Sequence, residues 1–511
     1  MPPTSPTAEP PAWARHLPAG IGPRDVDVVG EGTLPAAWVR GWRAAPARRV
    51  VHDVDEEWVS GADLLARSER LARRLVGAGV DRGDRVLLSG SASVAYVTAY
   101  VAALRAGFVV VPVNPAYSRR ELDVIVDDAS PRAAILESTA LRAAARERDP
   151  SMVVTEMGVD LPDGGAGTVL DAARPDDPAL LPYTSGTTGR PKGALLSHAN
   201  LLASAEAVRL AWRWTAADVL ILCLPLFHMH GLGVGLHGTL LTGGAAILQP
   251  QFDPEAVLAT AAGGDATMFF GVPTMYRRLV AADHPDRLAA LRLCVSGSAP
   301  LSGDLHAAVA ERCGQVVLER YGMTETVMLV SNPYDGERRP GTVGFPLPGV
   351  EVHLDAANDE ILVRGPNVFA GYFRRPDATA AAFTDDGWFR TGDIGSTDAD
   401  GYLRIVGRAK ELIISGGYNV YPREIEDVLR AHPSVIDAAV VGTPSEEWGE
   451  TVTAYVEARD PFDPADVVAW AATQLAPYKK PRLVHRVDAL PRNKLGKVLR
   501  DELRPPESRT A

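Results

Sequence analysis

Short apolar runs alternate with longer Ala-, Leu- and Arg-rich segments between residues 60 and 200, and this alternation most constrains how the chain folds. The runs at 85–89 and 108–113 are typical of buried strands, and the segment at 94–106 between them has helical spacing. Further short apolar runs lie at 219–224, 245–248 and 292–296. Strands that alternate with helices predict an α/β fold with parallel sheets covered on both faces.

The sequence pattern changes at two points in the second half of the chain. Over 350–406, Asp-Gly turns separate short alternating strands, which predicts an antiparallel, β-rich subdomain. Beyond Gly407-Arg408 we expect a smaller α+β unit, with helices at 422–430 and 464–475 and strands at 436–441, 451–456 and 483–487. The expected organisation is a disordered tail over 1–25, a large N-terminal domain over 26–407 and a small, mobile C-terminal domain over 408–511.

Composition excludes several classes of protein. The formal net charge of −12 opposes nucleic-acid binding as a main role, because such binding needs a basic surface. Three cysteines without CxxC spacing exclude a disulfide framework and a cysteine zinc site, and they fit a reducing cytoplasm. The first twelve residues lack the features of a signal peptide, and no apolar run is long enough for a membrane span. We therefore expect a soluble, cytoplasmic protein.

The strongest local signal is the loop YTSGTTGRPKG at residues 183–193. Its glycines let the backbone approach phosphate oxygens, its hydroxyl groups donate to them, and Lys192 adds charge. Only six of the 52 basic residues are Lys, and an ammonium differs chemically from a guanidinium, so a Lys here is informative. The loop does not match the Walker A pattern. A phosphate loop is favoured over the alternative, a simple surface loop.

This loop resembles the signature of the adenylate-forming superfamily, which comprises acyl-CoA synthetases, adenylation domains of peptide synthetases and luciferases. Four further motifs match in the family's order, namely YGMTE at 321–325, TGD at 391–393, GRAK at 407–410 and GK at 496–497. The resemblance covers residues from about 30 to 505. It implies that a carboxylate attacks the α-phosphate of ATP to give acyl-AMP, and that a thiol, usually that of CoA, then attacks the acyl carbonyl.

The resemblance also implies roles for individual residues at the phosphates and the adenine. The 183–193 loop, including Lys192, would hold the β- and γ-phosphates, Glu325 would bind Mg²⁺, and Thr324 would contact the α-phosphate. Tyr321 and the turn at 297–300 would flank the adenine. The residues expected to bind ATP are Thr184, Ser185, Gly186, Thr187, Thr188, Lys192, Ser298, Ala299, Pro300, Tyr321, Thr324, Asp393, Arg408 and Lys497.

Further implied roles lie in the last third of the chain. Asp393 would bind the ribose hydroxyls, with assistance from Arg408. Lys497 would be the catalytic Lys, which bridges the acid carboxylate and the α-phosphate, and it would act together with Thr324, Glu325 and Lys192. Lys410 would be the hinge about which the small domain turns between the two half-reactions. CoA would pass the residues Gly416 and Gly417.

Two stretches bear on which acid is used: 227–232 and the helix that opens with VPT at 272–274. His230 and Arg278 would offer a cation to a second carboxylate, and His228 would gate the pocket. Met323 and Gly231 would limit the pocket to small substituents at C2. This arrangement, together with ERYGMTE at 319–325, resembles malonyl-CoA synthetases. The prediction is a ligase for malonate or a small 2-substituted malonate such as methylmalonate. The alternative for Arg278 is a solvent-facing position, which is usual for an Arg-Arg pair on a helix.

Three alternatives remain open at this point. The enzyme could be a ligase for medium-chain fatty acids or aryl acids, or a stand-alone adenylation enzyme that loads a carrier protein. A non-catalytic binding module is the third, and the intact Lys192, Glu325, Asp393 and Lys497 oppose it. The GxGxxG match at 233–238 follows no clear strand, so a closely packed, glycine-rich helix is the better interpretation of it.

Overall fold

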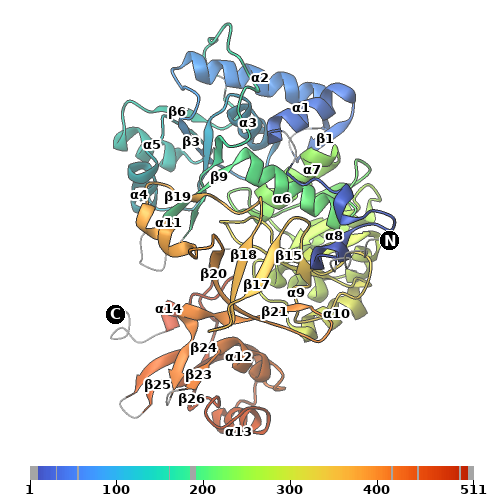
Figure 1. The fold of residues 1–511 in the computed structure, drawn as a ribbon, viewed down its shortest axis with the longest axis vertical. Helices are drawn as coiled ribbons and strands as arrows, with labels where there is room; N and C mark the ends of the chain where they lie inside the picture. The colour runs from blue at the N-terminus through green and yellow to red at the C-terminus, as the bar shows by residue number, and fades with distance from the viewer. Residues whose placement is uncertain are drawn as a thin grey trace, which may run out of the picture.

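The computed structural model describes residues 10–29, 32–54, 57–159, 161–184, 191–415, 418–445, 448–493 and 496–503, and the elements given below are those of these residues. Figure 1 shows a large N-terminal domain above a small C-terminal domain. The large domain is built on two sheets in which most neighbouring strands are parallel. The predicted α/β fold with parallel sheets is thereby confirmed.

The first sheet has the strand order β19-β9-β7-β4-β3-β5-β6, with β8 paired to β9. Its strands are β3 (Arg85–Ser89), β4 (Val109–Pro112), β5 (Ala133–Leu136), β6 (Val153–Glu156), β7 (Pro178–Leu180), β8 (Tyr183–Thr184), β9 (Lys192–Ser197) and β19 (Gly371–Tyr372). β3 to β6 pair in parallel, whereas β9 is antiparallel to β7, β8 and β19. The strand expected at 85–89 is β3, and the helix expected at 94–106 is α3 (Val94–Arg105).

The second sheet has the order β16-β15-β14-β13-β12-β10-β11-β1-β2, and its strands from β14 to β1 run parallel. Its strands are β1 (Arg49–His52), β2 (Val59–Ser60), β10 (Val219–Leu222), β11 (Ala245–Leu248), β12 (Met268–Gly271), β13 (Leu293–Ser296), β14 (Leu318–Tyr321), β15 (Val330–Ser331) and β16 (Phe345–Pro346). β12, β13 and β14 are buried at every position. β12 and β13 are accordingly almost entirely apolar, whereas β14 carries the charged residues Glu319 and Arg320.

Successive side chains of a strand point to opposite faces of the sheet, and their contacts show which helices cover each face. In β10, Leu220 and Leu222 join the core between the two sheets, whereas Ile221 packs on the outer helices. The helices between the sheets are α1 (Leu34–Ala44), α2 (Gly61–Gly77), α3, α6 (His198–Ala211), the π-helical turn η3 (His230–Leu236) and α7 (His237–Thr242). The outer helices are α4 (Arg119–Ala129) and α5 (Thr139–Arg148) on the first sheet, and α8 (Pro254–Ala262), α9 (Pro273–Ala281), η4 (Pro285–Ala290) and α10 (Gly303–Cys313) on the second.

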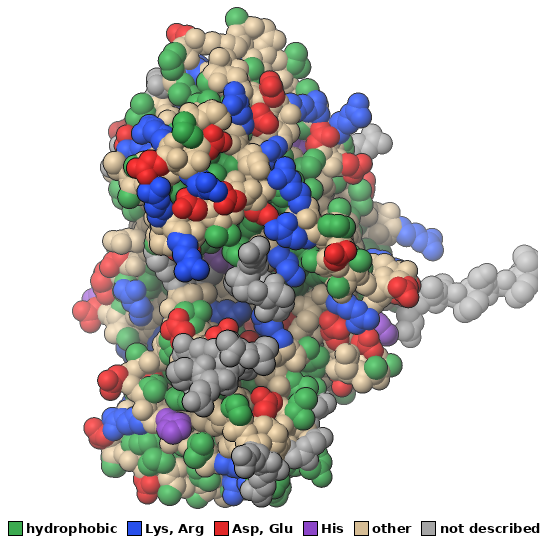
Figure 2. Space-filling view, turned by 90° about the vertical axis from the view of Figure 1, so that its left-hand side faces the viewer, with side chains coloured by type: hydrophobic (Ala, Val, Ile, Leu, Met, Phe, Trp, Pro, Cys, Tyr) green, Lys and Arg blue, Asp and Glu red, His purple; other side chains and the backbone are tan. Residues whose placement is uncertain are grey.

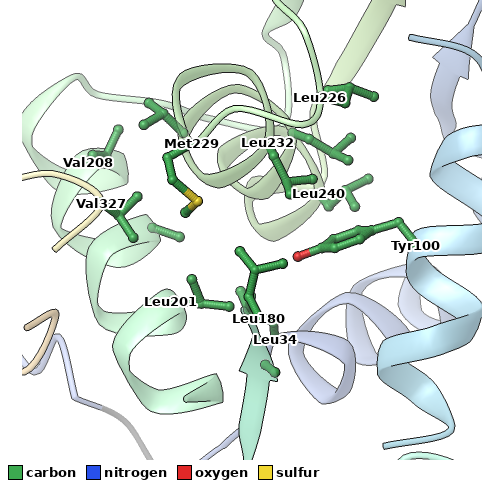
Figure 3. Close-up of a cluster of buried hydrophobic side chains, with 14 of the residues drawn as sticks. Leu34, Tyr100, Leu180, Leu201, Val208, Leu226, Met229, Leu232, Leu240 and Val327 are labelled. Carbon is green, nitrogen blue, oxygen red and sulfur yellow. The ribbon is translucent and has the colours of Figure 1, made fainter. Parts of the chain in front are cut away.

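The core between the sheets is a single apolar cluster to which distant segments contribute. Figure 3 shows Tyr100 of α3 beside Leu180 of β7, with Leu201 of α6 and Met229 on the other side. Serine caps set the starts of the helices around this core, because each serine oxygen accepts a backbone N–H of the first turn. The capping serines are Ser60, Ser93, Ser118, Ser138, Ser197 and Ser302.

An antiparallel, four-stranded sheet joins the large domain to the small one, as the Asp-Gly turns predicted. Its order is β17-β18-β20-β21, with β17 (Glu351–Leu354), β18 (Glu360–Arg364), β20 (Phe389–Thr397) and β21 (Leu403–Arg408), and α11 (Pro376–Ala382) lies beside it. β20 and β21 pair so that Asp393 lies opposite Arg408. This register brings together two residues of separate sequence motifs.

The small domain follows the turn η5 (Ala409–Glu411). Its sheet has the order β23-β22-β25-β24, and β26 pairs in parallel with β25. The elements are β22 (Ile413–Ser415), β23 (Tyr418–Val420), α12 (Pro422–Arg430), β24 (Val435–Ser445), β25 (Gly449–Ala458), α13 (Pro464–Gln474), β26 (Leu483–Val487) and α14 (Arg500–Leu503). Ile425 and Leu429 of α12 and Val467 of α13 pack on one face of the sheet. The elements expected at 422–430 and 483–487 have the predicted bounds.

The N-terminal segment corrects one prediction. Residues 10–25 form the turns η1 (Ala12–His16) and η2 (Pro23–Asp25), so the prediction of a disordered tail over 1–25 is wrong for them. His16 is buried, with its Nε2 atom 3.1 Å from the Phe345 carbonyl oxygen, and Arg213 donates to the His16 carbonyl at 2.6 Å. These partners lie far along the chain, which is why local polarity did not reveal them. Residues 1–9 lie outside the described residues.

The surface carries both signs of charge. On the face drawn in Figure 2, Lys and Arg side chains are interspersed with Asp and Glu side chains over both domains. Within the described ranges, we find no helix with the length and apolar character that a membrane crossing requires.

Candidate active site

A cavity of about 250 Å³ lies where the two domains meet. On the large-domain side it is lined at the carboxyl ends of β13 and β14, the edge at which α/β sheets bind ligands, and by β20 and β21. The small domain contributes α12, β24 and the segment 492–500. Half of the residues predicted to bind ATP line this cavity, namely Ser298, Ala299, Pro300, Tyr321, Asp393, Arg408 and Lys497.

Asp393 is held in the cavity by two side chains, those of Arg408 and Tyr321. Arg408 Nε lies 2.8 Å from Asp393 Oδ1, and the Tyr321 hydroxyl donates to Oδ2 at 2.5 Å. Burial and the neighbouring Asp393 charge raise the pKa of Tyr321, so its hydroxyl group stays a donor. Asp393 is only 2% exposed. Each carboxylate oxygen has a second lone pair, so the group retains capacity to accept from a pair of hydroxyls such as those of a ribose.

The turn at 297–300 forms one wall of the cavity directly after β13. Ser298 has a φ of 68°, in the left-handed region, and its Oγ lies 3.3 Å from His230 Nδ1. Gly297 leaves room for the Arg320 guanidinium, since a Cβ there would lie 2.4 Å from Arg320 Cζ and would force that side chain to move. The role of this turn at adenine stays a prediction.

The predicted phosphate residues meet around Tyr372, which sequence reasoning missed. Lys192 Nζ lies 5.3 Å from the centre of the Tyr372 ring, and the Tyr372 hydroxyl donates to Glu325 Oε1 at 2.9 Å. The Thr184 hydroxyl donates to the Lys192 carbonyl at 3.4 Å across the β8–β9 pair. The Gly-Tyr pair at 371–372 offered no signal in the sequence, because β19 joins β9 only in the fold. Ser185, Gly186, Thr187 and Thr188 lie outside the described residues.

Glu325 fits the role of a Mg²⁺ ligand. It is 6% exposed, and burial raises its pKa, whereas the hydrogen bond from Tyr372 opposes that shift. Mg²⁺ is usually held by one or two carboxylates together with substrate phosphates, and a single carboxylate beside the phosphate loop matches that donor set. Thr324, half-buried, precedes it in a turn that requires Gly322, where a Cβ would lie 2.2 Å from the Val327 carbonyl oxygen.

Lys497 reaches the cavity from the small domain. Its backbone N–H donates to Asn493 Oδ1 at 3.0 Å, and Arg492 donates to the Gly496 carbonyl at 2.6 Å, so Gly496 and Lys497 are tied to residues 492 and 493. Desolvation between the domains, followed by repulsion from Arg408, lowers the pKa of the Lys497 ammonium to about 8. Lys497 therefore lies within the electrostatic field of the Asp393–Arg408 pair and remains largely protonated at pH 7.

The two predicted histidines do not supply a cation in the free protein. Burial lowers the pKa of His228 to about 4, with further repulsion from Arg320 and Lys497. Burial also holds the pKa of His230 well below its usual value, and the ring stacks on Phe270 with centres 6.4 Å apart. Burial thus disfavours the positive charge that the prediction gave to His230 in the free protein. Both imidazoles remain hydrogen-bonding groups next to the cavity wall.

The prediction that Arg278 faces the acid is wrong. Tyr276 and Leu279 of α9 are buried as expected, and Arg277 lines the cavity, but Arg278 is exposed. The Arg278 guanidinium lies 4.9 Å from the centre of the Phe252 ring. Each helical residue is turned by about 100° from its neighbour, so the side chain after Arg277 points away from the cavity.

Arg320 is the cation that sequence reasoning missed. It lines the cavity, it is only 5% exposed, and its Nε and Nη2 atoms have no hydrogen-bond partner among the described residues. Burial lowers its pKa to about 9, which leaves the guanidinium charged at pH 7. The available signal was a charged residue next to Tyr321, inside a strand that is otherwise read as buried.

Five other predicted residues keep their roles as predictions. Gly231 is buried, and a Cβ there would lie 2.5 Å from the Pro225 carbonyl oxygen, so glycine is required for packing at this point. Met323 is half-buried against the central core. Lys410 is exposed in η5, between β21 and the small domain. Gly416 and Gly417 lie outside the described residues.

Fold and site together define an AMP-binding enzyme. The model of the AMP-binding enzyme family matches residues 38–373, and that of the AMP-binding enzyme C-terminal domain matches residues 424–497. The chain belongs to this adenylate-forming family. A feruloyl-CoA synthase from Amycolatopsis sp is 38% identical over 466 residues, which cover 87% of this chain and 93% of that protein.

Solved structures agree with this assignment. ATP-bound MatB from Rhodopseudomonas palustris is 41% identical and superposes with a TM-score of 0.85, covering 92% of this chain and 98% of that one. A malonyl-CoA ligase in a ternary product complex with methylmalonyl-CoA and AMP is 43% identical, with a TM-score of 0.65 and coverage of 88% and 98%. The protein is an AMP-forming acyl-CoA synthetase, that is, an ATP-dependent acid–CoA ligase.

Proposed function

We propose that this enzyme joins CoA to malonate or to a small 2-substituted malonate such as methylmalonate. The single observation that carries the proposal is the buried guanidinium of Arg320 in the cavity, whose Nε and Nη2 atoms have no hydrogen-bond partner among the described residues. A buried charge without a partner is strongly unfavourable, and a second carboxylate on the substrate would relieve that cost through a two-pronged contact. A monocarboxylic acid of the same size would leave Arg320 unpaired and would bind less well.

Neutral hydrogen-bonding groups lie near Arg320 and fit a carboxylate better than an alkyl chain. The His230 ring lies within the electrostatic field of Arg320, and its Nε2 atom has no partner among the described residues. The Ser298 hydroxyl lies beside His230 as well. Donors of this kind, next to a charged guanidinium, match the oxygens of a second carboxylate.

In the first half-reaction, the other carboxylate of the acid attacks the α-phosphorus of ATP. A new bond forms between a carboxylate oxygen and the phosphorus, the bond to the bridging oxygen breaks, and pyrophosphate leaves. Lys497 would reduce the repulsion between the two anions, while Asp393 and Arg408 hold the ribose. Lys192 and Thr324 would contact the phosphates. Mg²⁺, bound by Glu325 together with phosphate oxygens, supplies charge neutralisation when present.

In the second half-reaction, the CoA thiol attacks the acyl-AMP carbonyl, a carbon–sulfur bond forms, AMP leaves and the thiol proton passes to solvent. We propose that the small domain, from residue 408 onwards, turns about Lys410 between the two steps. The position of Lys410 in η5, at the junction of the domains, supports this role. CoA would then approach along Gly416 and Gly417.

The second candidate is an aryl-acid ligase, because one similar protein bears the name feruloyl-CoA synthase. An aryl acid would place apolar surface against the charged Arg320, which opposes this candidate. We do not pursue a carrier-protein acceptor, because the similar proteins described above bear CoA ligase names.

The test is a panel of acids offered to the purified enzyme with ATP, Mg²⁺ and CoA, with products identified by mass spectrometry. The panel contains malonate, methylmalonate, sulfoacetate, butyrate, octanoate and ferulate. We expect malonyl-CoA or methylmalonyl-CoA to form at the highest rate, and no product after removal of Mg²⁺ with EDTA. Feruloyl-CoA or octanoyl-CoA in the absence of malonyl-CoA would refute the malonate proposal. Acyl-AMP without any thioester would refute CoA as the acceptor.

A further inference from the structure

The first turn of α12 lies against β21 of the large domain. Arg423 Nη1 donates to the Ile405 carbonyl oxygen at 2.6 Å. Beside this bond, the Tyr421 ring lies 3.4 Å from the position that a Cβ would have on Gly407. Ile405 and Gly407 precede η5, and Tyr421 and Arg423 follow it, so this contact joins the two domains across their connection.

Arg423 also faces acidic groups from both domains. Its Nε lies 3.8 Å from Asp427 Oδ2, one turn further along α12, and the Arg423 side chain is 14% exposed. Across the cavity, Glu319 of β14 is buried, and Arg423 and Asp427 act on it electrostatically with opposite signs. Glu319 accepts from the Leu301 N–H at 3.0 Å through Oε1, whereas Oε2 has no hydrogen-bond partner among the described residues. The Arg423 charge thus has attractive partners on both sides of the cavity.

The contact at Ile405 lies on the same strand as Arg408, a residue proposed for the nucleotide site. β21 carries Ile405 and, three residues later, Arg408, which pairs with Asp393. The same small domain that donates through Arg423 also presents Lys497 to the field of Arg408 and Asp393. A second, longer contact between the domains runs from Arg277 of α9 to the Ile436 carbonyl at 3.4 Å.

We propose that Arg423 is an interdomain latch, a positioning residue whose bond to the Ile405 carbonyl holds the small domain where Lys497 faces Arg408 and Asp393. The latch favours formation of the adenylate and opens before the thioester forms. A turn about Lys410 must separate the two atoms, because Ile405 lies before that residue and Arg423 after it. This inference rests on the proposed two-step function and adds the residue that controls the exchange between the steps.

The first test separates the two half-reactions in the full-length enzyme. With whichever acid the panel identifies, acid-dependent ATP–pyrophosphate exchange should fall about 10- to 100-fold in Arg423→Ala, the effect of losing a charge-assisted hydrogen bond. Thioester formation from supplied acyl-AMP and CoA should change by less than about twofold, since the latch is open in that step. Arg423→Lys should recover part of the exchange rate. Equal losses in both half-reactions, or an unchanged exchange rate, would overturn the proposal.

A matched control lies on the same helix. Lys479 Nζ lies 2.7 Å from both carboxylate oxygens of Glu424, the residue after Arg423, and this ion pair lies within the small domain. Lys479→Ala removes a charged contact of α12 but leaves the bond to Ile405 intact. It should leave the ratio of the two half-reactions unchanged. A shift of that ratio equal to the shift in Arg423→Ala would assign the effect to α12 stability and overturn the latch.

A direct readout of domain position does not depend on the identity of the acid. The three native cysteines are buried, so spin labels can be placed at Glu311→Cys on α10 and Ala472→Cys on α13, both exposed. With ATP and Mg²⁺ present, Arg423→Ala should broaden and shift the distance distribution between the labels, whereas Lys479→Ala should not. An unchanged distribution would overturn the latch even if activity falls. If no acid of the panel reacts, the proposed function fails, and the distance measurement still decides about Arg423.

Discussion

The residues that we propose hold the nucleotide and those that we propose hold the acid, here called the nucleotide half and the acid half of the site, differ in how their charges are satisfied. In the nucleotide half, Asp393 is held by Arg408 and Tyr321, and Glu325 accepts from Tyr372. In the acid half, Arg320 is buried with two nitrogens that lack a partner among the described residues. The carboxylates of the nucleotide half and the Arg320 guanidinium are all buried, but only the carboxylates have partners within their half among the residues that the structure describes.

This difference has a physical meaning. Paired groups hold their geometry before substrate arrives, so the nucleotide half is preorganised for a ligand common to the whole family. An unpaired, buried cation instead lowers the stability of the free protein and gains a partner only when a complementary anion binds. If Arg320 binds the acid as we propose, the acid half loses stability in the free protein and gains discrimination between substrates. Four experiments test this comparison.

The largest effect should come from Lys497→Ala, at the meeting point of the two halves. We expect acid-dependent ATP–pyrophosphate exchange to fall about 100- to 1,000-fold for every acid, because the charge that bridges carboxylate and α-phosphate is lost. Thioester formation from supplied acyl-AMP should be largely retained. Both rates can be followed with radiolabelled pyrophosphate and by mass spectrometry. Equal damage to both half-reactions would contradict the role of Lys497 in adenylation alone.

Arg320→Met tests the acid half and should act selectively. The value of kcat/KM should fall about 100-fold with malonate, from the loss of a two-pronged, charge-assisted contact, and should be maintained with butyrate. Removal of a buried, unpaired charge should raise the free energy of unfolding by about 1–3 kcal/mol, measured with urea.

The matched control for Arg320→Met is Arg278→Ala, which removes an exposed guanidinium from the neighbouring helix. It should leave kcat/KM unchanged for both acids. Equal losses on malonate and butyrate in Arg320→Met would show that Arg320 is structural and would remove the contrast between the two halves.

Asp393→Asn tests the nucleotide half. It should lower the stability of the protein, whereas Arg320→Met should raise it. We expect kcat/KM for ATP to fall about 10- to 100-fold with every acid, because the charged acceptor of Arg408 and Tyr321 is lost. The free energy of unfolding should decrease by about 1–3 kcal/mol. Steady-state kinetics with two different acids and urea denaturation measure both quantities. A loss confined to one acid would place Asp393 in acid recognition instead.

The smallest effect is a dependence on pH near neutrality. The pKa of Lys497 is lowered to about 8, so the active ammonium is present below that pH and is lost as the pH rises through it. For the free enzyme, kcat/KM for ATP should be level from pH 6.5 to 7.5 and should fall about tenfold per unit well above pH 8. Because the pKa of Arg320 is lowered to about 9, malonate should show a steeper decline above that pH than butyrate. Identical profiles for the two acids would contradict this.

Much of the fold could be predicted because its signals are local. Pro422 opens α12 where a helix start was expected, and β3 has its predicted bounds, since helical spacing and apolar runs are properties of neighbouring residues. The glycine-rich stretch at 233–238 packs closely as predicted. A Cβ on Gly238 would lie 2.2 Å from the Trp214 ring, and one on Gly233 2.4 Å from Met229 Cε.

The sequence predictions that the structure opposes concern where a side chain points or whether it is charged, and not which residue types lie near the site. α9 was placed correctly, but a turn of about 100° per residue decides that Arg277 and not Arg278 meets the cavity. His230 lies beside the site, but burial disfavours the charge that the prediction gave it. Protonation depends on the dielectric environment, which the surrounding fold creates.

The class of enzyme and most of the residues proposed for the nucleotide could be found in the sequence, because each of them lies in a short motif of adjacent residues. Arg320, the cation proposed to meet the acid, stands out only in the folded protein, where β14 is buried and the Nε and Nη2 atoms have no hydrogen-bond partner among the described residues. The same holds for Tyr372, which reaches Glu325 from a strand added to the edge of β9. Burial and pairing between distant segments are collective properties, and no local pattern of residues encodes them.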